Sequence, residues 1–306
     1  MPTWRDPEVA AMREMFVAIQ PQPGAPPPTW PERRTQIDAL GAAAPLPEGT
    51  RVEPLTLGGV PAERVTPNNA PQDAGASRAI FWLHGGGYCI GGCASHRGWA
   101  ARMAEAAAAT AYTIDYRLAP EHPYPAAVDD ALAAWRAFLA EGHDPKRTVI
   151  GGDSAGGGLA VATAVAAREA GLPLPAGLHL VSTWANLTNA SPAYQAKGET
   201  DFIITQAGID DFATNYLLGG LDPSAPLASP VFADLAGLPP MLIQVGSEEV
   251  LMSDSVLLAE RAGFAEVDVT LRIWPGMVHI WPFFAQLSAS AKATAESAAW
   301  VKSRIP

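Results

Sequence analysis

The stretch Gly151-Gly152-Asp153-Ser154-Ala155-Gly156-Gly157 decides how the rest of this chain is interpreted. The run 147–150 before it is typical of a buried strand, and the Ala-rich run 158–167 after it is typical of a helix. A serine between small residues, at a tight turn from a strand into a helix, indicates a nucleophile elbow. Such a turn strains the serine backbone and holds its Oγ clear of the sheet. We therefore predict a nucleophilic Ser154, with a glycine-rich strand-to-helix connection as the alternative.

Strands and helices alternate along most of the chain, which predicts a doubly wound α/β sheet. The expected strands are 51–57, 60–65, 79–83, 111–115, 148–151, 177–183, 241–245 and 266–273, and the expected helices are 7–20, 33–40, 97–109, 125–140, 155–170, 206–218, 253–262 and 285–302. Ser95 is the expected N-cap of the helix from 97, and Gly142, Gly171 and Gly263 are expected to end three others. Gly58-Gly59 predicts a hairpin that gives the sheet an antiparallel edge.

A long insertion interrupts this alternation between Thr183 and Leu238. The pattern requires one helix there, and the chain instead supplies over fifty residues, including the amphipathic run 206–218. An insertion of this kind is typical of a lid over the carboxyl edge of the strands, where ligands bind in open α/β sheets. The alternative is a structural excursion that does not contact substrate.

Composition narrows the function classes. The 306 residues carry a net charge of −11 without a basic run, which argues against nucleic acid and anionic membranes as partners. Two cysteines, Cys89 and Cys93, argue against a disulfide scaffold and favour a reducing compartment. The six histidines lack metal-ligand spacing, so no metal is expected. No secretory signal and no bilayer-spanning run is evident, and the expected location is cytoplasmic.

A second glycine motif, His84-Gly85-Gly86-Gly87, follows the strand 79–83. Consecutive glycines at the end of a strand let backbone N–H groups turn toward a ligand without interference from Cβ atoms. Acyl transfer needs such donors, because negative charge develops on the carbonyl oxygen in its transition state. An H-G-G-G motif upstream of G-x-S-x-G is the arrangement of lipases and esterases.

A serine nucleophile requires a base and a carboxylate to orient it, and in this fold the chain order is Ser, acid, His. His279 follows the last expected strand, after the turn at Pro275-Gly276. Glu248, Glu249 and Asp254 follow the strand 241–245. Glu248 is preferred because it is nearest the strand end, Glu249 is the second choice, and Asp254 is interpreted as a first-turn helix carboxylate.

With these motifs the sequence resembles the bacterial hormone-sensitive-lipase family of α/β-hydrolases, the H-G-G-G esterases. The matching segments are 84–87, Tyr116-Arg-Leu-Ala-Pro-Glu-His122, 152–156, 184–188, 201–205 and Gly276-Met-Val-His279. The resemblance implies an α/β-hydrolase fold over residues 1–306, with a mostly parallel central sheet flanked by helices and a helical cap formed by about 1–45 and 188–225. It also implies carboxylester hydrolysis without a cofactor, and oxyanion donors at the N–H groups of Gly86, Gly87 and Ala155. The family acid is usually Asp, in an Asp-Pro-Leu or Asp-Glu-Val-Leu context, whereas Glu248 stands at that position here.

These observations predict a carboxylesterase with the triad Ser154, Glu248 and His279, acting through an acyl-enzyme on small short-chain or aryl esters. Two rival functions remain, an amidase or peptidase with the same triad and a non-catalytic ligand receptor on this fold. Aromatic residues that could line the substrate pocket, or equally pack the cap on the core, include Tyr88, Phe202, Phe212 and Trp281. Family members often dimerise through the last strand, here 266–273.

Overall fold

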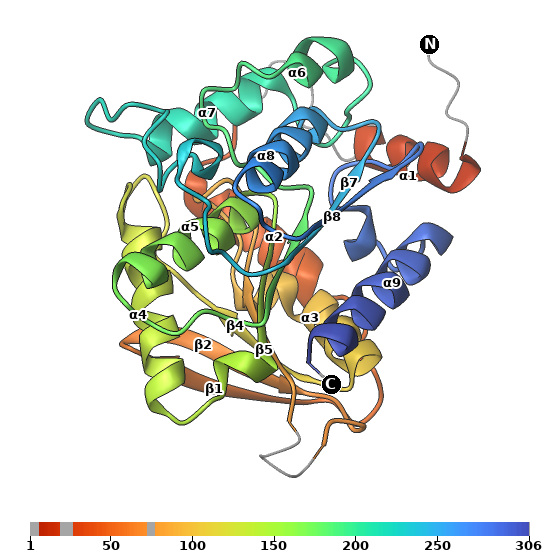
Figure 1. Cartoon of the computed structure of the whole chain (residues 1–306). Coiled ribbons are helices and arrows are strands. Elements are labelled where there is room, and N and C mark those ends of the chain that lie inside the picture. The colour runs from red at the N-terminus through yellow and green to blue at the C-terminus, as the bar shows by residue number, and fades with distance from the viewer. Residues whose placement is uncertain (1–5, 19–26, 72–76, 306) are drawn as a thin grey trace.

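The computed structural model describes residues 6–18, 27–71 and 77–305, and within them the strands form an eight-stranded sheet (Figure 1). Its spatial order is β1-β2-β4-β3-β5-β6-β7-β8. The strands are β1 (Arg51–Leu57), β2 (Val60–Thr66), β3 (Ala79–Leu83), β4 (Thr110–Ile114), β5 (Thr148–Asp153), β6 (Gly177–Val181), β7 (Met241–Gly246) and β8 (Val269–Trp274). The β1–β2 hairpin pairs antiparallel to β4, and every pair from β4 to β8 is parallel, as the sequence predicted.

The register of the parallel strands brings their carboxyl ends to one edge. Leu83 of β3 lies opposite Gly152 of β5, Asp153 of β5 lies opposite Val181 of β6, and Gly246 of β7 lies opposite Trp274 of β8. The glycine loop, the Ser154 turn, the acid-bearing turn and the His279 loop all leave the sheet at this edge. Segments almost 200 residues apart in the chain are thereby brought together.

Helices cover both faces of the sheet. They are α1 (Pro7–Ala18), α2 (Trp30–Ala42), α3 (Cys93–Ala107), α4 (Ala126–Ala140), α5 (Ala155–Glu169), α6 (Pro192–Lys197), α7 (Gln206–Tyr216), α8 (Met252–Phe264) and α9 (Ser288–Arg304), with short 3₁₀ turns at Pro145–Arg147, Pro230–Phe232 and Trp281–Phe283. The core on the α3 and α9 face contains Trp82, Trp99 and Val301. The core on the opposite face, below α4, α5 and α8, is larger because it continues into the insertion. This is the doubly wound arrangement that the alternating pattern predicted.

The insertion and the N-terminal helices meet beyond the carboxyl edge of the sheet. Figure 1 shows α6 and α7 at the top of the molecule, with α1 toward the same end. Phe202 of the insertion packs edge-on against Phe16 of α1, with ring centroids 5.6 Å apart. The ring of Phe212 in α7 packs against that of Trp30, the first residue of α2, with ring centroids 5.4 Å apart. Two segments far apart in the sequence thus form one layer over the strand ends.

Several local predictions need correction. The helix α3 begins at Cys93 with Gly92 as its N-cap, so Ser95 is not the cap; its Oγ instead accepts a hydrogen bond from the Gly92 N–H at 2.8 Å. Gly263 lies inside α8, which continues to Phe264. Gly142 and Gly171 do follow helices with φ of 91° and 67°, as predicted. The end of the first expected helix, residues 19 and 20, lies outside the described residues.

Candidate active site

Ser154 occupies a strained turn between β5 and α5. Its φ of 52° and ψ of −124° lie outside the regions that residues with side chains usually adopt. A Cβ on Gly152 would overlap the carbonyl of Gly156, and a Cβ on Gly156 would overlap the carbonyl of Leu83. The Ser154 N–H donates to the Val181 carbonyl at 2.9 Å and fixes the turn to β6. The two flanking glycines are therefore steric requirements of the turn, as the nucleophile-elbow interpretation expects.

The glycine loop turns its backbone beside this elbow. Gly86 and Gly87 have φ of 109° and 60°, conformations that favour glycine. Within the described residues, neither N–H group has a hydrogen-bond partner. Ala155 is the first residue of α5, where the backbone N–H has no intrahelical acceptor. The three N–H groups expected to bind an oxyanion are thus all left without a backbone acceptor.

Asp153 connects the elbow to the glycine loop. One carboxylate oxygen accepts from the Trp82 indole N–H at 3.1 Å and from the Gly85 N–H at 3.2 Å, and the other lies 3.3 Å from His96 Nε2. The carboxylate is almost fully buried. Its position supports a role in bracing the two loops and not in reacting with substrate.

His84 braces the same loop. Its ring stacks on Tyr116 with centroids 4.1 Å apart, and Nδ1 lies 2.7 Å from the Gly85 carbonyl. Burial, together with the neighbouring His96, lowers the pKa of His84 to about 4, so the ring is neutral near pH 7. A neutral ring suits a packing role.

His279 and Glu249 are held together at the same edge. His279 Nδ1 lies 3.0 Å from Oε2 of Glu249, and both side chains are buried. The other oxygen, Oε1, accepts from the Gly246 N–H at 2.6 Å and from the Ser182 hydroxyl at 2.8 Å. Because the carboxylate requires a donor at Nδ1, the neutral ring carries its proton there and presents a lone pair at Nε2.

Electrostatics favour protonation of this histidine. Burial disfavours the imidazolium, yet the hydrogen bond and charge of Glu249, together with the charges of Asp201 and Asp153, raise the pKa of His279 above its ordinary value. Burial also raises the pKa of Glu249, against the opposing effect of His279. When His279 takes up a proton at Nε2, the Glu249 carboxylate therefore stabilises the resulting imidazolium.

The preferred acid, Glu248, does not contact His279 in the structure, and the glutamate that does is Glu249, the second choice. The Glu248 N–H donates to the Met277 carbonyl at 3.0 Å, which directs its side chain away from the histidine. Glu248 instead forms an ion pair with Lys197 of α6 at 3.2 Å, and 23 % of its side chain is exposed. Glu249 is completely buried because the turn folds its carboxylate back onto the end of β7. Proximity to the strand end was a poor guide, since the turn reverses direction within three residues.

The two family contexts favour different glutamates. Asp-Pro-Leu places the acid two residues before a leucine, as Glu249 is before Leu251, whereas Asp-Glu-Val-Leu places it three residues before, where Glu248 stands. Ser182 was not identified, because a serine at a strand end has no distinctive pattern. Its hydroxyl donates to Glu249 and accepts from the Ile280 N–H at 3.0 Å, and thus contacts the segments of both the acid and the histidine.

The four aromatic residues expected at a substrate pocket occupy different environments. A Cβ on Gly87 would overlap the ring of Phe212, so this ring covers the glycine loop directly. Tyr88 is buried and stacks on Tyr216 at 3.8 Å, and Trp281 is fully buried beside Trp274. Phe202 packs on α1. Of the four, Phe212 is the one placed against the predicted oxyanion donors.

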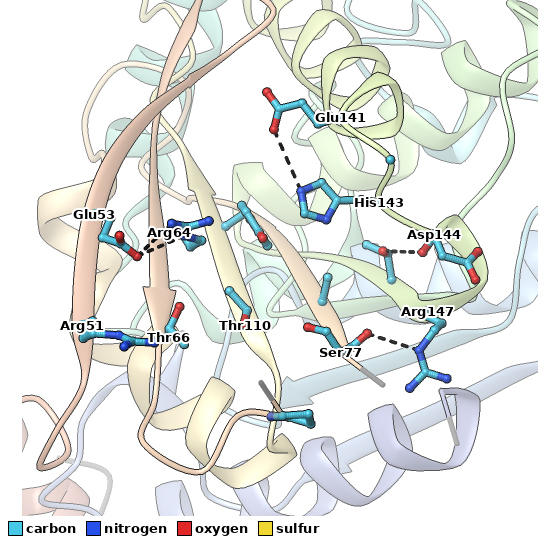
Figure 2. A pocket seen from close by; sticks show the side chains of 15 residues that line it. Arg51, Glu53, Arg64, Thr66, Ser77, Thr110, Glu141, His143, Asp144 and Arg147 are labelled. Carbon is cyan, nitrogen blue, oxygen red and sulfur yellow. Dashed lines mark hydrogen bonds and ion pairs between the residues drawn. The ribbon is translucent and has the colours of Figure 1, made fainter. Parts of the chain in front are cut away.

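A depression of about 800 Å³ lies at the opposite edge of the sheet (Figure 2). It is lined by the first residues of β3, β4 and β5 and by the loop after α4. Its charged side chains form pairs such as Arg64 with Glu53 and His143 with Glu141. Ser154 and His279 do not line it, so it is distinct from the candidate active site.

Known proteins resemble this chain in sequence and in fold. Residues 80–283 match a family described as having the alpha/beta hydrolase fold. An acetyl-hydrolase of Streptomyces hygroscopicus is 44% identical over 230 residues, covering 75% of each chain, and an esterase of Acinetobacter venetianus is 34% identical over 251 residues, covering 82% of this chain and 81% of that protein.

Solved structures agree over nearly the whole chain. An esterase of the bacterial hormone-sensitive lipase family superposes with a TM-score of 0.92 at 38% identity, covering 100% of both chains. A crystal of the protein EstE5 soaked with p-nitrophenyl butyrate gives a TM-score of 0.91 at 38% identity, covering 98% of this chain and 99% of that one. The chain belongs to the bacterial hormone-sensitive-lipase family of α/β-hydrolases. It is accordingly a carboxylic ester hydrolase.

Proposed function

We propose that this esterase hydrolyses small esters with short acyl chains or aryl alcohols, using Ser154 as nucleophile, His279 as base and Glu249 as the orienting acid. The observation that carries the proposal is the buried Glu249–His279 hydrogen bond of 3.0 Å at the edge of the sheet where the strained Ser154 turn emerges. The proposed cap consists of the N-terminal helices and the insertion, which are joined by the Trp30–Phe212 contact.

In the first half of the reaction, His279 Nε2 accepts the Ser154 hydroxyl proton as Oγ bonds to the ester carbonyl carbon. The negative oxygen of the tetrahedral intermediate accepts hydrogen bonds from the N–H groups of Gly86, Gly87 and Ala155, an interaction worth about 10²–10³ in rate for one donor. The intermediate collapses when His279 returns the proton to the leaving alkoxide, and the alcohol departs. An acyl-enzyme on Ser154 remains.

In the second half, water gives its proton to His279 and attacks the acyl carbon through the same oxyanion site. Collapse breaks the bond to Ser154, whose oxygen regains the proton as the carboxylic acid leaves. Glu249 stays ionised throughout and stabilises the imidazolium that forms in each half.

The preference for small esters is supported by the space that aromatic rings occupy near the site. Phe212 covers Gly87, and Tyr88 and Trp281 are packed without exposed surface. A related structure comes from a crystal soaked with p-nitrophenyl butyrate, a short-chain aryl ester. We expect kcat/KM to be higher for acetyl and butyryl esters than for octanoyl and palmitoyl esters, and Phe212→Ala to reduce this difference. An unchanged chain-length profile would contradict the role of Phe212.

Substitution of the nucleophile tests the whole assignment. Ser154→Ala is expected to lower kcat by about 10⁴-fold or more while the protein stays folded, because the acyl-enzyme no longer forms. Diethyl p-nitrophenyl phosphate should add one diethylphosphoryl group to the wild type at Ser154 and none to the variant, as read by mass spectrometry. The matched control is Ser224→Ala, at a partly buried serine of the insertion. A folded and active Ser154→Ala enzyme would refute the assignment, and equal rates on a matched anilide would favour an amidase.

The same reasoning extends to partners and location. The edge strand β8 pairs only with β7 within the sheet and exposes 42 % of Ile273, which supports a homodimer through this strand. The net charge of −11 supports the expectation that nucleic acid and stable membrane association are not involved. Two unpaired cysteines support a cytoplasmic location. Among the described residues, no helix is long and apolar enough to cross a membrane. Light scattering of the purified chain and cell fractionation test these points.

A further inference from the structure

The turn that carries Glu249 is bound on its outer side by the insertion. Lys197 of α6 pairs with Glu248, the Ala193 N–H donates to the Ser253 hydroxyl at 3.0 Å, and Asp201 accepts from the Val250 N–H at 3.0 Å. These contacts flank Glu249 in the sequence on both sides. The proposed cap is therefore attached to the segment that holds the acid.

Asp201 is the buried carboxylate among these contacts from the insertion. One of its oxygens accepts from the N–H groups of Ile203 and Ile204 at 3.0 and 2.9 Å, and the other accepts from Val250. Only 4 % of the residue is exposed. Three backbone donors on two oxygens suit an ionised carboxylate, which accepts and does not donate. No part of the proposed reaction uses this buried charge.

From this geometry we infer that Asp201 is a positioning residue for Glu249, through which the closed arrangement of the insertion is coupled to the alignment of the triad. The inference rests on the proposed triad. Val250 is bonded directly to Glu249, so the Asp201–Val250 hydrogen bond restricts the backbone that aims the Glu249 carboxylate at His279. Losing it frees that backbone, and a displacement of about 1 Å in a catalytic group can cost 10²-fold in rate.

Asp201 also acts on His279 through its charge. The groups that face His279 are Glu249 on the acid turn, Asp201 on the insertion and Asp153 at the elbow, and all three favour the imidazolium. Removing the charge of Asp201 lowers the pKa of His279, so more of the histidine is in the neutral, basic form at a given pH. The acidic limb of kcat/KM then moves to lower pH. A residue that only stabilises the fold would not move this limb.

Two substitutions at Asp201 separate the two effects. Asp201→Asn keeps the shape of the side chain but has only one carbonyl oxygen. It can therefore accept hydrogen bonds either from Ile203 and Ile204 or from Val250, and not from both sides. Asp201→Ser keeps a short acceptor for the local turn and cannot reach Val250. Both are expected to lower kcat about 10- to 100-fold with KM changed less than about 3-fold, and both are expected to shift the acidic limb to lower pH. Asp222→Asn is the matched control, because Asp222 caps a similar turn at Ser224 in the same insertion and is exposed.

The outcomes distinguish this inference from the proposed triad. If Glu249→Gln abolishes activity while both folded Asp201 variants keep the wild-type kcat and acidic limb, the triad stands and the inference is overturned. If Glu249→Gln remains fully active, the proposed triad itself fails. Should Asp201→Asn not fold, Asp201→Ser decides alone. A loss of kcat in Asp201→Ser without any movement of the acidic limb would reduce Asp201 to a structural role and overturn the inference.

Discussion

Charged side chains lie at both edges of the sheet, but they are buried at the carboxyl edge and exposed to solvent at the amino edge. At the carboxyl edge, Glu249 and His279 are buried and each polar atom of the carboxylate has a specific donor. At the amino edge, Arg64 and Glu53 form an ion pair with nearly half of each side chain exposed (Figure 2). Water screens the second pair and not the first. Only the pair at the carboxyl edge is therefore held in a fixed, water-excluded geometry of the kind that catalysis requires.

Burial and directed hydrogen bonds distinguish the carboxyl edge from the amino edge, although only the amino edge carries the large depression of Figure 2 among the sites described above. Two histidines illustrate it. The carboxylate beside His279 raises the pKa of that ring, whereas burial lowers the pKa of His143 at the other edge although Glu141 lies 4.0 Å away. The surroundings of these two histidines thus shift their pKa values in opposite directions.

The strongest test of the buried edge compares two adjacent glutamates. Glu249→Gln is expected to lower kcat by about 10²–10⁴-fold, because the amide can no longer stabilise the imidazolium and can stabilise the wrong tautomer of His279. Glu248→Gln is expected to stay within about 3-fold of wild type, since it removes only a partly exposed ion pair with Lys197. Steady-state kinetics on p-nitrophenyl butyrate with both folded variants decides between them. The reverse ranking would restore Glu248 as the acid.

The pH profile gives the next largest effect. Because the pKa of His279 is raised in the folded protein, its neutral form is lost as the pH falls through a value above about 6.5. We expect the acidic limb of kcat/KM to lie above that pH and to fall about tenfold per pH unit below it. NMR titration should show His143 losing its proton below about pH 6.5 and His279 above it. An acidic limb well below pH 6 would contradict the assigned environment of His279.

Local features of the fold could be predicted from the sequence, whereas contacts between distant segments of the chain could not. The alternation of buried strands with helices, and the glycines around Ser154, have local causes, and the structure reproduces them. The choice between Glu248 and Glu249 depends on backbone hydrogen bonds to Trp274 and Met277, which come from a different strand and loop. Such contacts have no periodicity in the sequence. The misassigned cap at Ser95 has a similar origin, because Asp115 of another loop accepts from Cys93 and starts the helix earlier.

A smaller effect is expected at Ser182, the residue after β6, whose hydroxyl contacts Glu249. Ser182→Ala removes the hydroxyl that donates to Glu249 at 2.8 Å and accepts from the Ile280 N–H, and leaves both partners buried. Loss of one such bond costs about 1–3 kcal/mol, so we expect kcat to fall about 10-fold with little change in KM. Ser182→Thr, which restores the hydroxyl, should recover part of the rate. Equal rates for wild type and Ser182→Ala would show that the Gly246 N–H alone orients the carboxylate.

The smallest effect is expected at the exposed edge, and it completes the comparison. Arg64 of β2 lies directly across from Glu53 of β1, and the 3.0 Å ion pair between them is open to solvent. Exposed pairs contribute about 0–1 kcal/mol to the free energy of unfolding. Arg64→Met should therefore leave kcat and KM within about 2-fold of wild type, and the small loss of stability should vanish in about 1 M salt. If this substitution instead lowered kcat as strongly as Ser182→Ala, the two edges would be energetically coupled through β3 and β4, and the depression in Figure 2 would have to be treated as part of the working enzyme.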